Sequence, residues 1–203
     1  MYGDLMKTAA QSYATATSGQ DRVIEHAIAA FVENGYEATT IDDIAKSMQA
    51  TKGFIYHYFT SKAEILYRVY SQAMDDLLDM LAKEFAKGEK PEIRLERALS
   101  AHISFILRYP VLIRTTWAVR RPDYPSRYRR KILSQSDRVL RLYSDGVIAA
   151  THPPVVDLER VHRMVHHLMA SVMWLPSWIE HKQNTEVIAQ ELAKMVLASV
   201  QSR

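Results

Sequence analysis

Residues 39–66 read TTIDDIAKSMQATKGFIYHYFTSKAEIL. Within this stretch Thr40, Thr51 and Ser61 each stand before apolar residues that recur three and four positions apart. A hydroxyl residue before such a run is a common start of an amphipathic helix. The spacing therefore predicts two short helices joined by a tight turn and then a longer helix, which is a helix-turn-helix arrangement.

The same periodicity continues outward from this stretch in both directions. Asp21 begins a periodic run that Asn34 and Gly35 end, because glycine readily takes the positive φ found just beyond a helix. We expect an all-α fold of about nine helices. The predicted division is a flexible tail (1–20), a helix-turn-helix domain (21–66) and a larger helical domain (67–203), with helices at 61–85, 91–107, 126–150, 157–181 and 185–200 and a short segment from 110 to 119.

Composition excludes several classes of protein. The 203 residues include no cysteine, which removes disulfides, thiolate metal sites and cysteine nucleophiles. The six glycines never cluster, so nucleotide-binding glycine loops and the nucleophile elbow are absent. No apolar run reaches membrane-spanning length, and the polar first twenty residues do not resemble a signal peptide. We expect a cytoplasmic protein with no membrane partner, metal or cofactor.

The positive charge is unevenly distributed. The formal net charge is +3 and the pI is about 9.0. Residues 94–143 hold 12 basic and 3 acidic side chains, whereas residues 21–62 carry a net charge of −2. The basic pI is therefore not evidence that the helix-turn-helix binds nucleic acid.

The second short helix has an unusual surface. Ile55 and Phe59 lie four residues apart and are expected to point inward. The other large side chains of the helix are then expected to point away from this core; they are Lys52, Phe54, Tyr56, His57 and Tyr58. Exposed aromatic side chains on one small helix are costly unless a partner covers them. Lys62 lies in the first turn of the next helix, where its charge opposes the macrodipole and where a phosphate partner would explain it. The alternatives are that Tyr56 and Tyr58 belong partly to the core, that Phe54 packs on the tail and that Lys62 is a solvated charge.

Residues 21–67 resemble the DNA-binding domain of TetR-family transcriptional repressors. The matching stretches are Ala29–Phe31, Gly35-Tyr36, Thr39–Ala45, Lys52–Phe59 and Ser61–Leu66. The resemblance implies double-stranded operator DNA as a partner. It places phosphate contacts at Thr40, Tyr56 and Lys62, base-edge contacts at Lys52, Phe54 and His57, and further DNA-facing positions at Gly53 and Tyr58.

Phe54 departs from the family pattern, which often has threonine or serine at this position. A phenyl ring makes no conventional hydrogen bond but can pack on a thymine methyl group. The departure predicts an unusual sequence preference at this position.

The resemblance also makes residues 67–203 a ligand-binding and dimerisation domain. Methionine and aromatic side chains suit an adaptable apolar pocket, although at helical spacing the same residues are often core. The candidate pocket residues are His102, Phe105, Arg114, Trp117, Tyr143, His166, Met169, Met173, Trp174 and Trp178.

An arginine-rich segment spans residues 114–131 and adds Arg120 and Arg121 to the candidate ligand site. Arginine recognises phosphate through two parallel hydrogen bonds. An apolar pocket beside arginines would suit an acyl-CoA thioester, and residues 102–178 loosely resemble TetR-type regulators of fatty-acid and steroid breakdown that sense such thioesters. The alternatives are a solvated helix face, a DNA-flanking contact, a membrane surface, and an effector that is a neutral or cationic hydrophobic or aromatic compound.

The last two predicted helices carry apolar stripes at Val161, Met164, Val165, Leu168, Val172 and Leu175 and at Val187, Ile188, Leu192, Met195 and Val196. In the family such helices form the homodimer, and two-fold symmetry predicts a palindromic operator. We expect a repressor that a small effector releases from DNA. The rival is a metal-dependent helical enzyme, favoured by Glu159-x-x-His162, but di-iron carboxylate folds need two copies of that signature and the chain has one.

Overall fold

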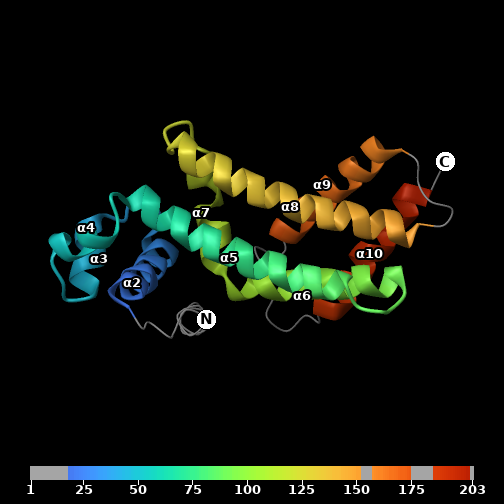
Figure 1. Ribbon diagram of the computed structural model, residues 1–203, viewed down its shortest axis with the longest axis horizontal. Coiled ribbons are helices and arrows are strands. Elements are labelled where there is room, and N and C mark those ends of the chain that lie inside the picture. The colour runs from blue at the N-terminus through green and yellow to red at the C-terminus, as the bar shows by residue number, and fades with distance from the viewer. Residues whose placement is uncertain (1–17, 152–156, 175–184, 202–203) are drawn as a thin grey trace. The chain divides into compact units, whose positions relative to one another are not determined.

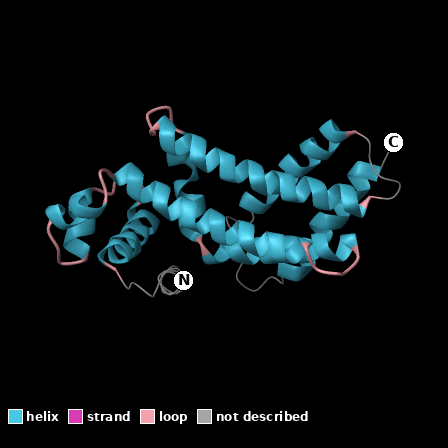
Figure 2. Ribbon diagram, in the orientation of Figure 1, coloured by secondary structure: helices cyan, strands magenta, loops and turns pink. Residues whose placement is uncertain are grey.

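The computed structural model describes residues 18–151, 157–174 and 185–201. These residues form nine helices and no strand (Figures 1 and 2), in agreement with the all-α prediction. The helices are α2 (Gly19–Asn34), α3 (Ile41–Ser47), α4 (Lys52–Tyr58), α5 (Lys62–Phe85), α6 (Pro91–Arg108), α7 (Pro110–Arg120), α8 (Ser126–Ala150), α9 (Leu158–Trp174) and α10 (Thr185–Gln201).

The helices divide between two compact units. Of the described residues, the first unit comprises 18–73 and 108–133, and the second comprises 74–107, 134–151, 157–174 and 185–201. The predicted boundary between residues 66 and 67 stays a prediction, and in the compact units α7 and the start of α8 group with the helix-turn-helix. Helical periodicity marks which residues form each helix but does not show which helices pack together.

Side-chain caps fix where the short helices begin. The Thr40 hydroxyl accepts from the Asp43 backbone N–H at 3.2 Å, and the Asp43 carboxylate accepts from the Thr40 backbone N–H at 2.9 Å. Ser18 and Asp21 form the same reciprocal cap on α2, so this helix begins inside the predicted tail. At α5 the Ser61 hydroxyl accepts from the Glu64 backbone N–H at 3.2 Å, and the Glu64 carboxylate accepts from the Thr60 backbone N–H at 2.8 Å. Each such cap stabilises a helix by about 1 kcal/mol.

The core of the first unit lies where α2, α3, α4 and the start of α5 meet. Its largest side chains, with at most 2% of their surface exposed, are Phe31, Ile44, Ile55, Phe59 and Leu66. The predicted inward orientation of Ile55 and Phe59 is therefore confirmed.

The second unit has its own core, with Leu77, Leu81, Leu95, Leu99 and Ile103 among its buried members. The stripes predicted to meet a second subunit are partly used here. Val161, Val165, Leu168 and Val172 on α9 and Val196 on α10 are buried within the chain. They pack within the subunit, and the predicted dimer through the last two helices stays a prediction. The predicted stripe member Leu175 lies outside the described residues.

Among the described residues, no helix is both long enough and apolar enough to cross a lipid bilayer.

Candidate nucleic-acid interface

Helix α4 presents three faces to three different surroundings. Ile55 and the following Phe59 enter the core. Phe54 and Tyr58, four residues apart, lie with ring centroids separated by 5.4 Å and pack against the first residue of α2. A Cβ atom on Gly19 would stand only 2.8 Å from Tyr58 Cζ and 3.0 Å from Phe54 Cζ. A side chain at position 19 would therefore require the Tyr58 ring to shift.

The packing on Gly19 changes the interpretation of two predicted DNA-facing residues. Phe54 and Tyr58 are only partly exposed because they cover the start of α2. The alternative that Phe54 packs on the N-terminal segment agrees with this placement, and the same contact accounts for Tyr58.

The third face of α4 is exposed and consists of Lys52, Gly53, Tyr56 and His57. These positions are i, i+1, i+4 and i+5, which lie side by side on a helix. The Tyr56 side chain is 55% exposed. A Cβ atom on Gly53 would meet only the Thr51 hydroxyl, at 3.6 Å, so the backbone there is open to close approach. A cation, a phenol and an imidazole on one exposed face can contact both phosphates and base edges.

Lys52 is held on this face by an exposed ion pair. Its Nζ lies 3.4 Å from Asp42 Oδ1, and Lys46 Nζ lies 3.3 Å from Asp42 Oδ2. These contacts lower the pKa of the Asp42 carboxyl, with the hydrogen bond from Lys46 as the largest cause. Exposed pairs of this kind stabilise a protein by only about 0–1 kcal/mol, so Lys52 can exchange Asp42 for a phosphate at little cost.

Thr40 is exposed at the start of α3, but its hydroxyl is already used. It donates to Asp43 Oδ2 at 2.6 Å while it accepts from the Asp43 backbone N–H. The hydroxyl oxygen nevertheless lies at a helix N-terminus, where backbone N–H groups favour an anion.

Gln49 is a feature of the turn that sequence reasoning missed. It has a φ of 53°, the only positive φ among the described non-glycine residues. The left-handed conformation lets the chain reverse between α3 and α4. The signal in the sequence was weak, because glycine or asparagine usually occupies such a position.

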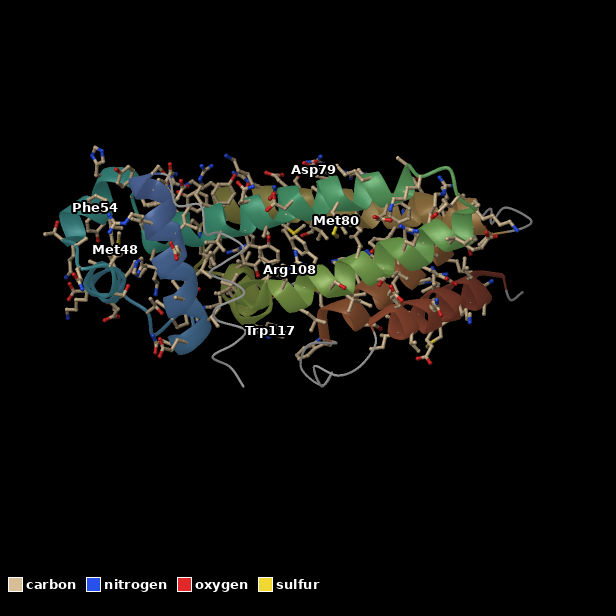
Figure 3. The ribbon with its side chains drawn as sticks, turned by 90° about the horizontal axis from the view of Figure 1, so that it is seen from below. Met48, Phe54, Asp79, Met80, Arg108 and Trp117 are labelled. Carbon is tan, nitrogen blue, oxygen red and sulfur yellow. The ribbon has the colours of Figure 1, made fainter. Side chains whose placement is uncertain are left out.

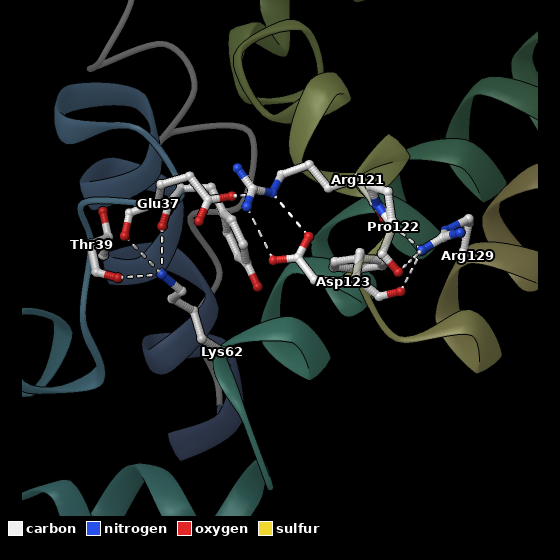
Figure 4. Close-up of polar contacts among 9 residues, drawn as sticks. Glu37, Thr39, Lys62, Arg121, Pro122, Asp123 and Arg129 are labelled. Carbon is white, nitrogen blue, oxygen red and sulfur yellow. Dashed lines mark hydrogen bonds and ion pairs between the residues drawn. The ribbon is translucent and has the colours of Figure 1, made fainter.

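Lys62 has partners other than the predicted phosphate. Its Nζ donates to the carbonyl oxygens of Tyr36, Glu37 and Thr39 at 2.6, 3.2 and 2.7 Å (Figure 4). The ammonium also lies 4.4 Å from the centroid of the Tyr36 ring. Burial lowers the pKa of Lys62. An ammonium has three N–H donors, and in this structure all three are directed at backbone oxygens.

Residues 23–69 match the family model described as "Bacterial regulatory proteins, tetR family". The match covers about a quarter of the chain, and it shows that residues 23–69 are similar to this family. A curated relative, the biofilm operon icaADBC negative transcriptional regulator IcaR of Staphylococcus aureus (strain Newman), is 42% identical over 62 residues, which are 30% of this chain and 31% of that protein. The chain therefore matches about a third of the length of that relative.

Solved structures of other proteins share the fold over most of the chain. FadR from Bacillus subtilis in complex with stearoyl-CoA matches this chain with a TM-score of 0.72 at 18% sequence identity. The match covers 89% of this chain and 98% of the FadR chain. AibR in complex with isovaleryl coenzyme A and operator DNA gives a TM-score of 0.72 at 16% identity and covers 88% and 97%. At this identity the likeness concerns the fold alone.

The first unit also contains the α7–α8 corner (residues 120–129), and its Arg120 and Arg121 were predicted to bind a ligand. Arg121 lies 3.0 Å from Asp123 and 3.5 Å from Glu37, and Arg129 Nη2 donates to the carbonyl oxygens of residues 121, 122 and 124 (Figure 4). These two guanidinium groups hold the corner together, which argues against a ligand role for Arg121.

Tyrosines join the same corner to the helix-turn-helix. The Tyr124 hydroxyl donates to the Ala63 carbonyl oxygen at 3.0 Å, and its ring lies 6.4 Å from that of Tyr36. The Tyr67 and Tyr128 rings stack at 4.9 Å, and burial raises the pKa of Tyr124. These bonds explain why residues 108–133 belong to the first unit, which no helical periodicity could have indicated.

Two of the predicted pocket residues meet in the second unit. His102 Nδ1 and the Tyr143 hydroxyl are 3.1 Å apart, and that hydroxyl donates to the Ala98 carbonyl oxygen at 3.2 Å. Both side chains are buried, as is Phe105. Burial lowers the pKa of His102 to about 4 and raises that of Tyr143. The pair is neutral at physiological pH.

The remaining predicted pocket residues are not gathered with this pair. Trp117 is 67% exposed (Figure 3) and, like the exposed Arg120, belongs to the first unit. On α9, His166 and Trp174 are exposed, and Met169 and Met173 are partly exposed. The Arg114 side chain and Trp178 lie outside the described residues.

Proposed function

We propose that this TetR-family protein is a transcriptional repressor that binds operator DNA through the exposed face of α4 and is released by a small-molecule effector. The family match supports transcription regulation, and IcaR, which shares 42% identity over 62 residues, is a negative regulator. The observation that carries the proposal is the contiguous exposed face formed by Lys52, Gly53, Tyr56 and His57.

Each residue of this face has a distinct task. Lys52 approaches the duplex as a cation, Tyr56 donates its hydroxyl to a phosphate, and His57 reaches base edges in the major groove. Gly53 allows the backbone to come close. Phe54 and Tyr58 support α4 from behind through their contact with Gly19.

The test begins with selection of operator sequences from random duplex DNA by the purified protein. Affinity for the selected operator is then measured by fluorescence anisotropy from 50 to 200 mM salt. For Lys52→Met we expect weaker binding and a slope of log K against log salt that is shallower by about 0.9, since one fewer counterion is released. The matched control is Lys83→Met, an exposed lysine of the second unit. Equal slopes for the two variants would contradict the proposed face.

We propose that the repressor acts as a homodimer that reads a palindromic operator. Large apolar side chains are exposed on the last two helices, with Leu158 58% exposed, Trp174 55%, Val187 49% and Met195 65%. A second copy of the chain would remove this surface from water. Met195→Asp is expected to shift sedimentation equilibrium towards the monomer and to weaken operator binding.

The effector that we propose is an acyl-CoA thioester. Support comes from two structural neighbours of the same fold, AibR with isovaleryl coenzyme A and FadR with stearoyl-CoA, and from the exposed Arg120 and Arg130 in the basic segment. Mass spectrometry of the natively purified protein identifies any retained ligand. Calorimetry with acyl-CoA, free coenzyme A and an uncharged aromatic compound separates the classes. Binding of the aromatic compound alone would refute the thioester.

A further inference from the structure

Lys62 is in a position that helix energetics does not favour. It occupies the first residue of α5, where the positive end of the helix dipole repels a cation. Its side chain is also partly buried, which adds a desolvation cost. A lysine in this position therefore needs strong partners.

Those partners are the three carbonyl oxygens in the turn between α2 and α3. The distances of 2.6, 3.2 and 2.7 Å to Tyr36, Glu37 and Thr39 use every N–H of the ammonium. The Tyr36 ring covers the ammonium at 4.4 Å. A single side chain of α5 thus binds three of the four turn residues 36–39.

The turn leads directly to the DNA-facing elements. Thr39 is buried, and its hydroxyl lies 2.7 Å from the Gly35 carbonyl oxygen, while the next residue, Thr40, caps α3. Helix α3 in turn contacts α4 through the Asp42–Lys52 ion pair. A displacement of this turn would therefore move the start of α3 and the exposed face of α4.

We propose that Lys62 is a positioning residue for operator binding, which ties the first turn of α5 to the α2–α3 turn and thereby sets the placement of α3 and α4 on DNA. The inference rests on the proposed function. This task differs from a phosphate contact. To bind a phosphate, the Lys62 ammonium would have to release the carbonyl oxygens of Tyr36 and Thr39 that it now binds.

The chemistry of the three acceptors distinguishes lysine from arginine. Three convergent carbonyl oxygens match the three tetrahedral N–H groups of an ammonium, whereas a guanidinium is a planar fork that matches phosphate. Arginine would therefore preserve a phosphate contact but not this one.

The experiment compares Lys62→Met, Lys62→Arg, Lys52→Met and Lys83→Met with the wild-type protein on the selected operator. Binding is measured at 10 °C, where circular dichroism confirms that each variant is folded. For Lys62→Met and Lys62→Arg we expect affinities lower by about tenfold to a hundredfold, with the wild-type dependence on salt. A slope shallower by about 0.9, as expected for Lys52→Met, or full affinity in Lys62→Arg would show a phosphate contact and overturn the proposal.

A second measurement needs no DNA. Amide hydrogen exchange is followed at residues 39–43 in the wild-type protein and in Lys62→Met. We expect faster exchange in the variant at these residues and unchanged exchange in α9. Unchanged protection at residues 39–43, or wild-type affinity in Lys62→Met, would overturn the positioning role. If the wild-type protein selects no DNA sequence, the proposed function fails, and the exchange result still decides whether Lys62 holds the turn.

Discussion

His102 makes the stability of the second unit depend on pH. The imidazole is buried beside the Tyr143 hydroxyl, and burial lowers its pKa to about 4 from an ordinary value of 6.5. The unfolded chain therefore binds a proton at His102 more readily than the native protein does. The neutral, buried His102 therefore makes its full contribution to the free energy of unfolding above pH 6.5. This contribution is lost progressively as the pH falls from 6.5 towards 4.

The size of the effect follows from the two pKa values. One pKa unit corresponds to about 1.36 kcal/mol, and integration of the titration gives a loss of about 2 kcal/mol between pH 7.5 and pH 5. This amount is a large part of the usual free energy of unfolding, which is about 5–15 kcal/mol.

The assay is urea unfolding of the wild-type protein and of His102→Phe at pH 7.5, 6.5, 5.5 and 5.0. Protein concentration is kept constant, because association would otherwise contribute. Subtracting the two free energies of unfolding removes the contribution of carboxylates common to both proteins. We expect the difference to fall by about 2 kcal/mol across this range. A difference that stays constant, or an imidazole NMR signal of native His102 that titrates near pH 6.5, would refute the reasoning.

Two further predictions concern glycine geometry. Gln49→Gly should raise the free energy of unfolding by about 0.5–1 kcal/mol, because it relieves the left-handed strain at φ 53° at the cost of unfolded-chain entropy; a urea midpoint that falls instead would contradict this. Gly146→Ala should destabilise the second unit by about 1–3 kcal/mol, because its Cβ would lie 3.0 Å from Phe85 Cζ. Gly88→Ala is its control, since a Cβ there meets nothing within 4 Å, and equal melting temperatures for the two variants would count against the crowding.

The candidate interface was only partly predictable from sequence. The inward orientation of Ile55 and Phe59 followed from their spacing, and so did the exposure of the face that contains Lys52 and Tyr56. The packing of Phe54 and Tyr58 could not be predicted from their spacing, because it depends on a close approach of Gly19, which is more than thirty residues away in the chain. Spacing along a helix shows which residues share a face, but not what each face meets.

The sequence by itself determined the helices, their caps and the helix-turn-helix, since hydrophobic periodicity and N-terminal hydroxyl residues are local properties of the chain. Only the tertiary structure decided the partners of the charged residues. Lys62 was expected to meet phosphate and Arg121 a ligand, yet Lys62 binds backbone carbonyl oxygens and Arg121 pairs with carboxylates. A cationic side chain is equally compatible with phosphate, carboxylate or carbonyl oxygen, and the choice depends on which acceptors the fold brings within about 3 Å.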